Sequence, residues 1–500
     1  MNVLLVKPSC GCESQVKSAP LGLLSIASYL KERGCCVHIY DRIMEKRSPE
    51  EAARAFWPDA VGVSVASTAD VHDGVKVSRW FRKKGIPVIW GGQFASLVPE
   101  MVLKEGRADY VVMEEGEITF HELLRAIETK SGLAEVEGIA YLGQSGAVCR
   151  TPAREFADLA DFPAIDWSLI NPAEYFFPDT ETGSEKMLCL YSSKGCPGHC
   201  AFCYNRLFHH SKHRKRPSGQ VLAEMKELAE QYGMDGVYFV DDDMFGGNKS
   251  DLRDFCEQLR SLGLNVVWRC FANIGRLSSE DFRLMYEAGC RKIFCGLESG
   301  SPETLKCMRK TLNIATLEND VRSCHEAGIW TECSFVLGFP GETEGQLRDT
   351  VRLLLRLEPN LTKFQILMYF PVPGTEKYIQ LVEAGRLTPP RTLREWGRHG
   401  AQEDMFDNFS DVPTRDLRVV QAHFYWKMFT RKTNETGAAR RKAVRRAFIS
   451  LLRKISRQNF FNMFKFTLSS AKLFLTIAWY SHAYPGVRRK YGIECNEKAL

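Results

Sequence analysis

Residues 195–204 read Gly195-Cys196-Pro197-Gly198-His199-Cys200-Ala201-Phe202-Cys203-Tyr204, and they closely follow an apolar run from Met187 to Tyr191. A short apolar run of this kind predicts a buried β-strand. Three cysteines would therefore converge from one loop at the carboxyl end of a strand. In open parallel sheets, this end is where ligands bind. The stretch predicts a parallel α/β fold with a site built on this loop.

The spacing of Cys196, Cys200 and Cys203 favours an iron–sulfur cluster over the alternatives. Such clusters are usually held by four Cys thiolates, and this loop supplies three, which leaves one iron open to bind a substrate. Zinc normally takes four ligands in paired spacings, and His199 is poorly placed to complete a tetrahedron from inside the same loop. Zinc and unliganded buried thiols remain as the alternatives.

Apolar runs alternate with amphipathic stretches on both sides of the motif, which predicts two successive α/β domains. Residues 1–130 contain five such runs and predict a Rossmann-like, doubly wound parallel sheet. Residues 131–185 resemble a connector with a short hairpin. Residues 186–380 contain six runs and predict a partial (β/α)6 barrel, and residues 381–500 predict a helical, basic region. At the strand ends of the first domain stand small or acidic residues, among them Asp41, Ser64, Ser67, Gly91 and Gly92.

Composition indicates a globular chain of several domains, because 44% of its 500 residues are hydrophobic and 26% are charged. Its 17 cysteines are too sparse for a small disulfide scaffold, which favours a reducing cytoplasmic location. The first eight residues lack the features of a signal peptide. The most apolar late segment, residues 460–480, is interrupted by Lys465 and Lys472, so we expect no transmembrane helix.

Positive charge is concentrated at the end of the chain. Residues 431–500 contain sixteen Lys and Arg against three acidic residues, whereas the whole chain has a net charge of +6. Basic residues there interleave with apolar ones at helical spacing, namely Arg445, Arg446, Arg453, Lys454 and Arg457 with Phe448, Leu451, Leu452 and Ile455. One interpretation is a packed helix with a solvated basic face. The other is docking on anionic lipid, which would suit a lipid-like substrate. We expect no nucleic acid partner.

The cysteine motif, with an aromatic residue before its last cysteine, resembles that of the radical S-adenosylmethionine (SAM) superfamily. The resemblance implies that the open iron of a 4Fe-4S cluster chelates SAM. Reductive cleavage of SAM then yields a 5'-deoxyadenosyl radical. It also implies a reducing electron donor such as flavodoxin or ferredoxin. Phe202 would lie at the cofactor, with a plain core residue as the alternative.

The resemblance continues in order along the chain through four further segments, the last of which is residues 368–375. In residues 238–245 it implies that Asp241 and Asp242 receive the methionine ammonium, and in residues 296–301 that Glu298 and Ser301 approach SAM. In residues 335–343 it implies that Gly338 packs near adenine. The alternatives are a solvated loop or helix cap for residues 241–243 and a structural carboxylate for Glu298.

Residues 1–130 resemble the cobalamin-binding domain that precedes many radical SAM domains, which implies that Ser64, Ser67, Gly91 and Gly92 contact cobalamin. Paired glycines let the backbone approach a large ring. The family usually has His at Phe94 and Gly at Glu114. No DxHxxG loop is present and we read His72 as a surface residue, so this chain would give cobalt no His ligand. The alternative is a domain that has lost cobalamin.

The basic run His209-His210-Ser211-Lys212-His213-Arg214-Lys215-Arg216 follows the cysteine loop. It would hold an anionic group of the substrate or of SAM, or it is a solvated loop.

These features predict a cobalamin-dependent radical SAM enzyme that methylates an unactivated carbon of a small-molecule or lipid-like substrate. The resemblance also covers the anaerobic Mg-protoporphyrin monomethyl ester cyclase, so a cyclase or rearrangement enzyme without methyl transfer is the first alternative. A non-catalytic cobalamin or redox sensor is the second. The sequence singles out no catalytic residue beyond the cofactor ligands.

Overall fold

The computed structural model describes residues 1–10, 18–105, 107–398, 408–431, 480 and 484–493. The chain divides into two compact units. The first comprises Met1–Phe294, Glu326–Trp330 and Pro371–Met405, and the second comprises Cys295–His325, Thr331–Phe370 and Phe406–Leu500.

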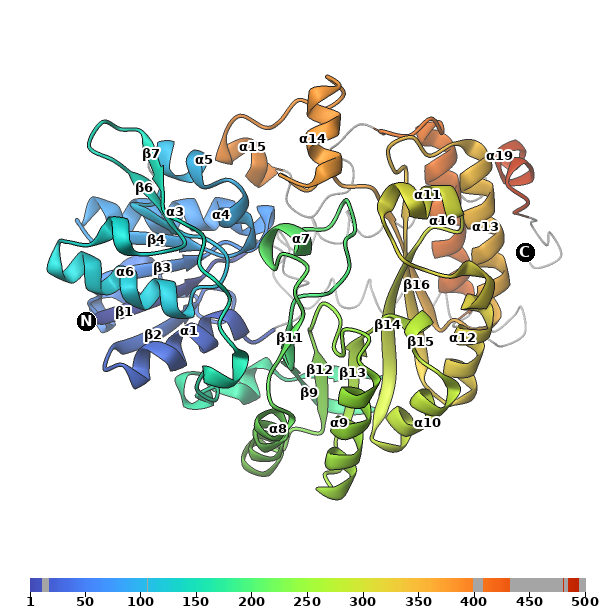
Figure 1. Ribbon diagram of the computed structural model, residues 1–500, viewed down its shortest axis with the longest axis horizontal. Helices are drawn as coiled ribbons and strands as arrows, with labels where there is room; N and C mark the ends of the chain where they lie inside the picture. Colours follow the sequence, from blue (N-terminus) through green and yellow to red (C-terminus); the bar gives the residue numbers. More distant parts are fainter. Residues whose placement is uncertain (11–17, 106, 399–407, 432–479, 481–483, 494–500) are drawn as a thin grey trace, which may run out of the picture. The chain divides into compact units, whose positions relative to one another are not determined.

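The first unit begins with a seven-stranded sheet, drawn in blue to cyan in Figure 1. Its order is β2 (Cys36–Asp41), β1 (Asn2–Lys7), β3 (Ala60–Ser64), β4 (Val88–Gly91), β5 (Tyr110–Val112), β6 (Ile139–Leu142) and β7 (Val148–Arg150). The five strands from β2 to β5 are parallel, which confirms the predicted doubly wound sheet. The predicted hairpin of the connector adds β6 and β7 antiparallel to it.

Apolar runs form these strands because their residues are covered by helices. Val3, Leu4 and Val6 are fully buried in β1, and burial of a Val or Leu side chain contributes about 1.5–3 kcal/mol. The helices are α1 (Leu21–Glu32), α2 (Pro49–Ala55), α3 (Val71–Lys83), α4 (Gln93–Leu97), α5 (Pro99–Lys104) and α6 (Glu117–Thr129). Trp90 of β4 is buried against α3, where its indole Nε1 donates a hydrogen bond to Ser78 Oγ at 2.7 Å.

The first unit also holds most of a second sheet, in which β8 (Phe177–Asp179) pairs antiparallel with β9 (Ser184–Leu190). Parallel pairing then continues through β12 (Gly236–Phe239) and β13 (Val267–Phe271) to the first half of β14 (Cys290–Glu298). The helices α8 (Ser218–Tyr232), α9 (Lys249–Ser261) and α10 (Ser279–Glu287) connect these strands. A small ladder of β10 (Ser193–Lys194) and β11 (Arg214–Lys215) encloses the cysteine loop and α7 (Asn205–Phe208).

The second unit contains the rest of β14 and the parallel pair β15 (Trp330–Leu337) and β16 (Lys363–Met368). Its helices include α11 (Pro302–Met308), α12 (Ile314–Glu326), α13 (Glu344–Leu357), α16 (Thr414–Arg431) and α19 (Pro485–Lys490). The six strands predicted after residue 186 are therefore present, and they are neighbours in one sheet. Leu347, Val351 and Leu354 give α13 a fully buried face. The predicted amphipathic basic helix, with Arg445 to Arg457, lies outside the described residues.

Residues 371–405 return to the first unit with α14 (Glu376–Glu383) and α15 (Leu393–Arg398). Trp396 of α15 is buried against Phe94, with 5.6 Å between the ring centroids. Phe94 therefore serves in packing, which accounts for an apolar ring where a His was expected. Among the helices of the described residues, none combines the length and the apolar character needed to cross a bilayer.

Candidate functional site

A cavity of about 380 Å³ opens at the carboxyl ends of the first sheet. The predicted residues Ser64, Gly91 and Gly92 line it, and so do Asp241 and Asp242 from the end of β12. The segment after the cysteines contributes Tyr204, Phe208 and His209 to the same wall. Ser67 is not among the lining residues. Its hydroxyl donates to Asp70 Oδ2 at 3.1 Å in a short turn.

Glycines form part of this wall, and at two of them the surrounding atoms leave no room for a Cβ. Gly92 has φ +97°, and a Cβ there would lie 2.9 Å from Val65 O. A Cβ at Gly62 would lie 2.8 Å from the Leu5 side chain and 2.9 Å from the Phe120 ring, both of which line the cavity. Glycine at these positions puts no side chain on the wall, which fits a large ring such as cobalamin.

The three cysteines are half-buried on one loop, and two of their sulfurs accept backbone hydrogen bonds. Gly198 N donates to Cys196 Sγ at 3.4 Å, and Asn205 N donates to Cys203 Sγ at 3.5 Å. A Cβ at Gly198 would lie 3.4 Å from Cys196 Sγ and 3.8 Å from Cys200 Sγ, so glycine leaves the space between two sulfurs open. Burial, together with the nearby Cys200 and Asp242 charges, raises the pKa of Cys203 to about 12.

A donor set of this kind fits an iron–sulfur cluster, in which each thiolate binds a different iron. Among the described residues, no three His, Cys, Asp or Glu side chains converge on a point where one ion would sit. A cluster does not require such a point. Phe202 lies half-buried between the last two cysteines, and its role in cofactor binding stays a prediction.

Asp241 and Asp242 differ in their surroundings although they are neighbours. Asp241 is buried, and its carboxylate accepts hydrogen bonds from Ser192 N at 2.8 Å and Ser193 Oγ at 2.8 Å. Burial raises the pKa of Asp241 to about 7 in spite of these hydrogen bonds. Asp242 instead accepts hydrogen bonds from Tyr204 and Asn205, on the segment after the cysteines. The contacts of both carboxylates within the chain brace the loop, and their binding of SAM stays a prediction.

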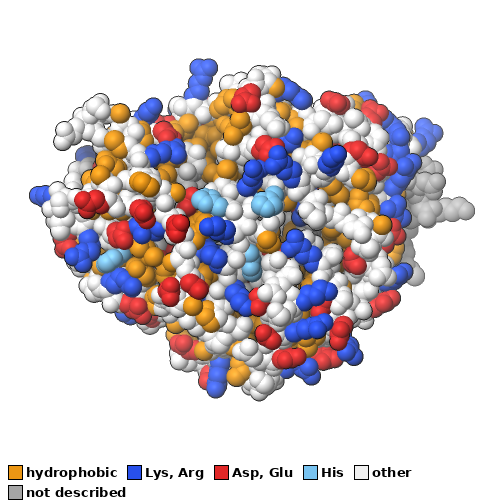
Figure 2. Space-filling view, in the orientation of Figure 1, with side chains coloured by type: hydrophobic (Ala, Val, Ile, Leu, Met, Phe, Trp, Pro, Cys, Tyr) orange, Lys and Arg blue, Asp and Glu red, His pale blue; other side chains and the backbone are white. Residues whose placement is uncertain are grey.

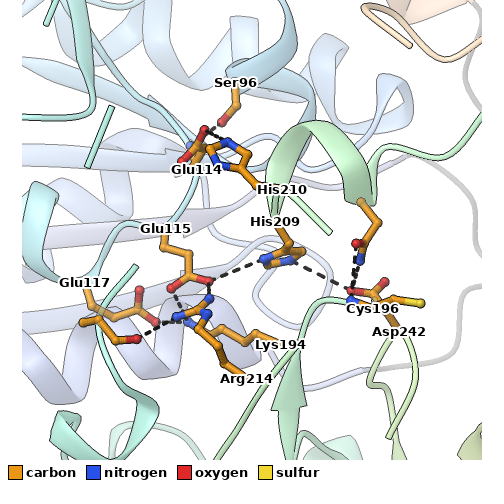
Figure 3. Close-up of polar contacts among 12 residues, drawn as sticks. Ser96, Glu114, Glu115, Glu117, Lys194, Cys196, His209, His210, Arg214 and Asp242 are labelled. Atoms are coloured by element: carbon orange, nitrogen blue, oxygen red, sulfur yellow. Dashed lines mark hydrogen bonds and ion pairs between the residues drawn. The ribbon is translucent and has the colours of Figure 1, made fainter. Parts of the chain in front are cut away.

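A network of buried charges joins the end of β5 to the ladder around the cysteine loop (Figure 3). Lys194 Nζ lies 2.6 Å from Glu117 Oε1 and 3.7 Å from Glu115 Oε2. Arg214, opposite Lys194 in the ladder, also contacts Glu115, and His209 Nδ1 lies 3.5 Å from Glu115 Oε1. Burial raises the pKa of Glu115, but Lys194, His209 and Arg214 outweigh it and lower the pKa to about 2. The sequence pattern assigned no role to Lys194, Glu115 or Glu117, whereas His209 and Arg214 belong to the basic run that was expected to hold an anionic group.

The structure corrects the interpretation of the basic run 209–216 as a solvated loop. Figure 2 shows His, Lys and Arg side chains gathered over the α7 and β11 region, but several members turn inward. Arg216 is buried, with Nη1 2.7 Å from Glu224 Oε2, and Arg214 contacts Glu115. His210 Nε2 lies 2.8 Å from Glu114 Oε1. The run is therefore paired largely with the chain's own carboxylates.

Two of these paired residues adopt a backbone conformation that is rare for residues with a side chain. Glu114 has φ +59° and His210 has φ +52°. Glu114 also lines the cavity. The side chain that replaces the expected glycine is thus held by a partner from the segment after the cysteines.

The second unit holds the remaining predicted SAM contacts. Glu298, at the end of β14, has φ +66° and is buried, with Oε1 3.6 Å from Lys310 Nζ and Oε2 accepting from Ser334 Oγ at 3.3 Å. Burial raises the pKa of Glu298. Ser301 caps α11 by accepting from Thr304 N at 3.3 Å. The roles of Glu298 and Ser301 in binding SAM stay predictions.

Gly338, with φ +76°, follows β15 and donates its N–H to Glu342 Oε2 at 2.7 Å. Glu342 is almost fully buried, and burial raises its pKa to about 7. Sequence reasoning gave Glu342 no role. The sequence feature that could have identified Glu342 is its position at the end of the run Gly338-Phe339-Pro340-Gly341-Glu342.

Comparison with protein families gives two matches. The model described as the radical SAM superfamily matches residues 190–354, and the model described as the B12 binding domain matches residues 13–124. The chain is 28% identical over 388 residues to an uncharacterised methyltransferase of Pyrococcus horikoshii, covering 75% of this chain and 82% of that protein. It is 26% identical over 399 residues to the anaerobic magnesium-protoporphyrin IX monomethyl ester cyclase of Cereibacter sphaeroides, covering 76% and 64%.

Solved structures share the fold. The radical SAM methyltransferase TsrM of Kitasatospora setae, with tryptophan and a SAM analogue bound, superposes with a TM-score of 0.66 at 22% identity over 78% of this chain and 77% of that one. The cobalamin-dependent radical enzyme OxsB, with aqua-cobalamin and SAM bound, gives a TM-score of 0.70 at 16% identity over 100% and 81%.

Proposed function

Because this chain belongs to the radical SAM enzymes that carry a B12-binding domain, we propose that it methylates an unactivated carbon of its substrate. The cofactors are those of this class, namely a 4Fe-4S cluster, SAM and cobalamin. When bound, they supply a 5'-deoxyadenosyl radical that removes a hydrogen atom and a methyl group that replaces it. The chain itself binds, orients and shields the reacting groups.

The observation that carries the proposal is the composition of the cavity wall. Ser64, Gly91 and Gly92 come from the B12-binding sheet, while Tyr204 and Phe208 directly follow the cysteines. A group seated on the glycine wall would therefore lie beside the loop that we propose to hold the cluster. Methyl transfer after hydrogen removal requires such proximity.

We propose Cys196, Cys200 and Cys203 as the cluster ligands. Phe202, Asp241, Asp242, Glu298, Ser301 and Gly338 are proposed for SAM. Ser64, Gly91 and Gly92 are proposed for cobalamin, with Ser67 nearby in sequence. The domain limits that we propose are 1–130 for cobalamin, 131–185 for the connector, 186–380 for the SAM barrel and 381–500 for the carboxyl-terminal region.

The first experiment is anaerobic reconstitution with iron, sulfide, SAM and methylcobalamin under a low-potential reductant. We expect 5'-deoxyadenosine from the native chain and none from Cys196→Ala, Cys200→Ala or Cys203→Ala. Cys307→Ala is the matched control because Cys307 is exposed on α11. Full deoxyadenosine formation by the three loop variants would refute the cluster assignment.

The second experiment separates methylation from the cyclase alternative, which the similarity to the protoporphyrin cyclase keeps open. The holoenzyme is supplied with SAM carrying a trideuterated methyl group and with fractionated small molecules and lipids. Methylation predicts a product that carries the label, together with equal amounts of deoxyadenosine and S-adenosylhomocysteine. Substrate-dependent deoxyadenosine without labelled product would favour a cyclase or rearrangement, and no deoxyadenosine at all would favour a sensor.

A third experiment concerns the substrate and the role of the carboxyl-terminal region. A small-molecule or lipid-like substrate remains our proposal, and the basic residues 431–500 would serve peripheral membrane contact. Co-sedimentation of the full chain with anionic vesicles, compared with neutral vesicles, tests this. Equal binding to both would reject the contact.

A further inference from the structure

Asn205 connects the two ends of the cysteine loop. It is the second residue after Cys203 and only 3% exposed. Its side-chain Oδ1 accepts from Cys196 N at 3.3 Å, while its own N–H donates to Cys203 Sγ at 3.5 Å. One side chain and its backbone thus hold the first and last cysteines of the motif. The position of Asn205 therefore fixes the spacing of two proposed ligands.

Asp242 holds Asn205 in turn. Its Oδ2 accepts from Asn205 Nδ2 at 2.9 Å, and its Oδ1 accepts from Tyr204 Oη at 2.6 Å. Both carboxylate oxygens are thus bound by consecutive residues that follow Cys203. His209 Nε2 lies 3.9 Å from the same Oδ2 (Figure 3).

The carboxylate of Asp242 is also an electrostatic element of this loop. Its side chain is only 24% exposed, so water screens its charge less than it would screen a surface charge. A fixed negative charge near a redox centre disfavours the addition of an electron. Tyr204 stays a hydrogen-bond donor, since burial and the charge of Asp242 both raise its pKa.

We propose that Asp242 is a positioning residue for the iron–sulfur cluster, which fixes the cysteine loop through Asn205 and Tyr204 and lowers the reduction potential of the cluster by its charge. This inference rests on the proposed cluster. It gives Asp242 a task besides the proposed contact with SAM, because each of its carboxylate oxygens accepts a hydrogen bond from the segment after the cysteines.

The test uses the reconstituted full-length holoprotein without SAM, in which the midpoint potential of the cluster and the rate of iron release to a chelator are measured. Asp242→Asn removes the charge and keeps the shape. Tyr204→Phe removes one hydrogen bond and keeps the charge. Asp254→Asn is the matched control, because Asp254 is exposed on α9 of the same unit.

We expect a positive shift of the midpoint potential in Asp242→Asn only, and iron release several-fold faster in both Asp242→Asn and Tyr204→Phe. A midpoint in Asp242→Asn equal to that of Asp254→Asn would overturn the electrostatic role. An unchanged rate of iron release in Tyr204→Phe would overturn the positioning role. This measurement tests the proposal even where Asp242→Asn fails to fold. A native chain that assembles no cluster would refute the proposed function instead.

Discussion

The ammonium of Lys194 lies 2.6 Å from Glu117 Oε1 in the interior of the first unit. The two residues are 77 positions apart in the sequence, and their side chains are 18% and 4% exposed. Burial lowers the pKa of Lys194, but Glu117 and Glu115 outweigh it and raise the pKa overall. The pair joins the amino end of α6 to the residue that precedes the cysteine loop.

We predict that Lys194→Met destabilises the apoprotein by about 3 kcal/mol, because it leaves buried carboxylates without their cation. The free energy of unfolding in urea measures the effect. Lys226→Met is the control, since Lys226 forms an exposed pair with Glu230 and should change stability by less than about 0.5 kcal/mol. Equal losses in the two variants would contradict the prediction.

Gly92 and Gly85 provide a matched pair for the cavity wall. Both have positive φ, +97° and +74°, but only a Cβ at Gly92 would clash, at 2.9 Å from Val65 O. We expect Gly85→Ala to cost about 1 kcal/mol for its left-handed backbone, and Gly92→Ala to cost at least about twice that. Gly92→Ala should also lose cobalamin during gel filtration, as measured by absorbance. Retention equal to that of Gly85→Ala would argue against the proposed cobalamin wall.

Glu298→Gln tests the proposed SAM contact in the second unit. The substitution keeps the volume and removes the charge, so we expect SAM to bind about 10- to 100-fold more weakly, the range for a hydrogen bond to a charged group. Calorimetric titration of the reconstituted protein measures this. Glu318→Gln, in an exposed pair with Arg356, should bind like the native chain. Native affinity in Glu298→Gln would remove Glu298 from the site.

The buried carboxyl group of Glu342 should make the free energy of unfolding depend on pH. Burial raises its pKa from 4.5 to about 7, so the folded state binds more protons than the unfolded state between these values. Its contribution to the free energy of unfolding is therefore greatest below pH 4.5 and falls as pH rises toward 7, by up to about 3 kcal/mol. Glu342→Gln should lack this fall. Parallel pH profiles of the native chain and the variant would show that Glu342 does not titrate in this range.

Much of the fold follows from local pattern. The runs Val3–Val6 and Met187–Tyr191 predict buried strands because alternating helices must cover both faces of a parallel sheet, and both runs are strands. The cysteine loop was placed after a strand for the same reason. The pairing of Arg214 and Arg216 with Glu115 and Glu224 was missed, since a run of charges looks the same in a sequence whether it is solvated or paired.

The sequence by itself determined the proposed ligand set, because Cys196, Cys200 and Cys203 lie within eight residues and their spacing is a local property. Only the tertiary structure decided which groups hold that loop. Lys194, Asn205 and Asp242 acquire their roles from partners brought together by packing. Charged and polar groups that lose water must find partners, and those partners are chosen by the fold.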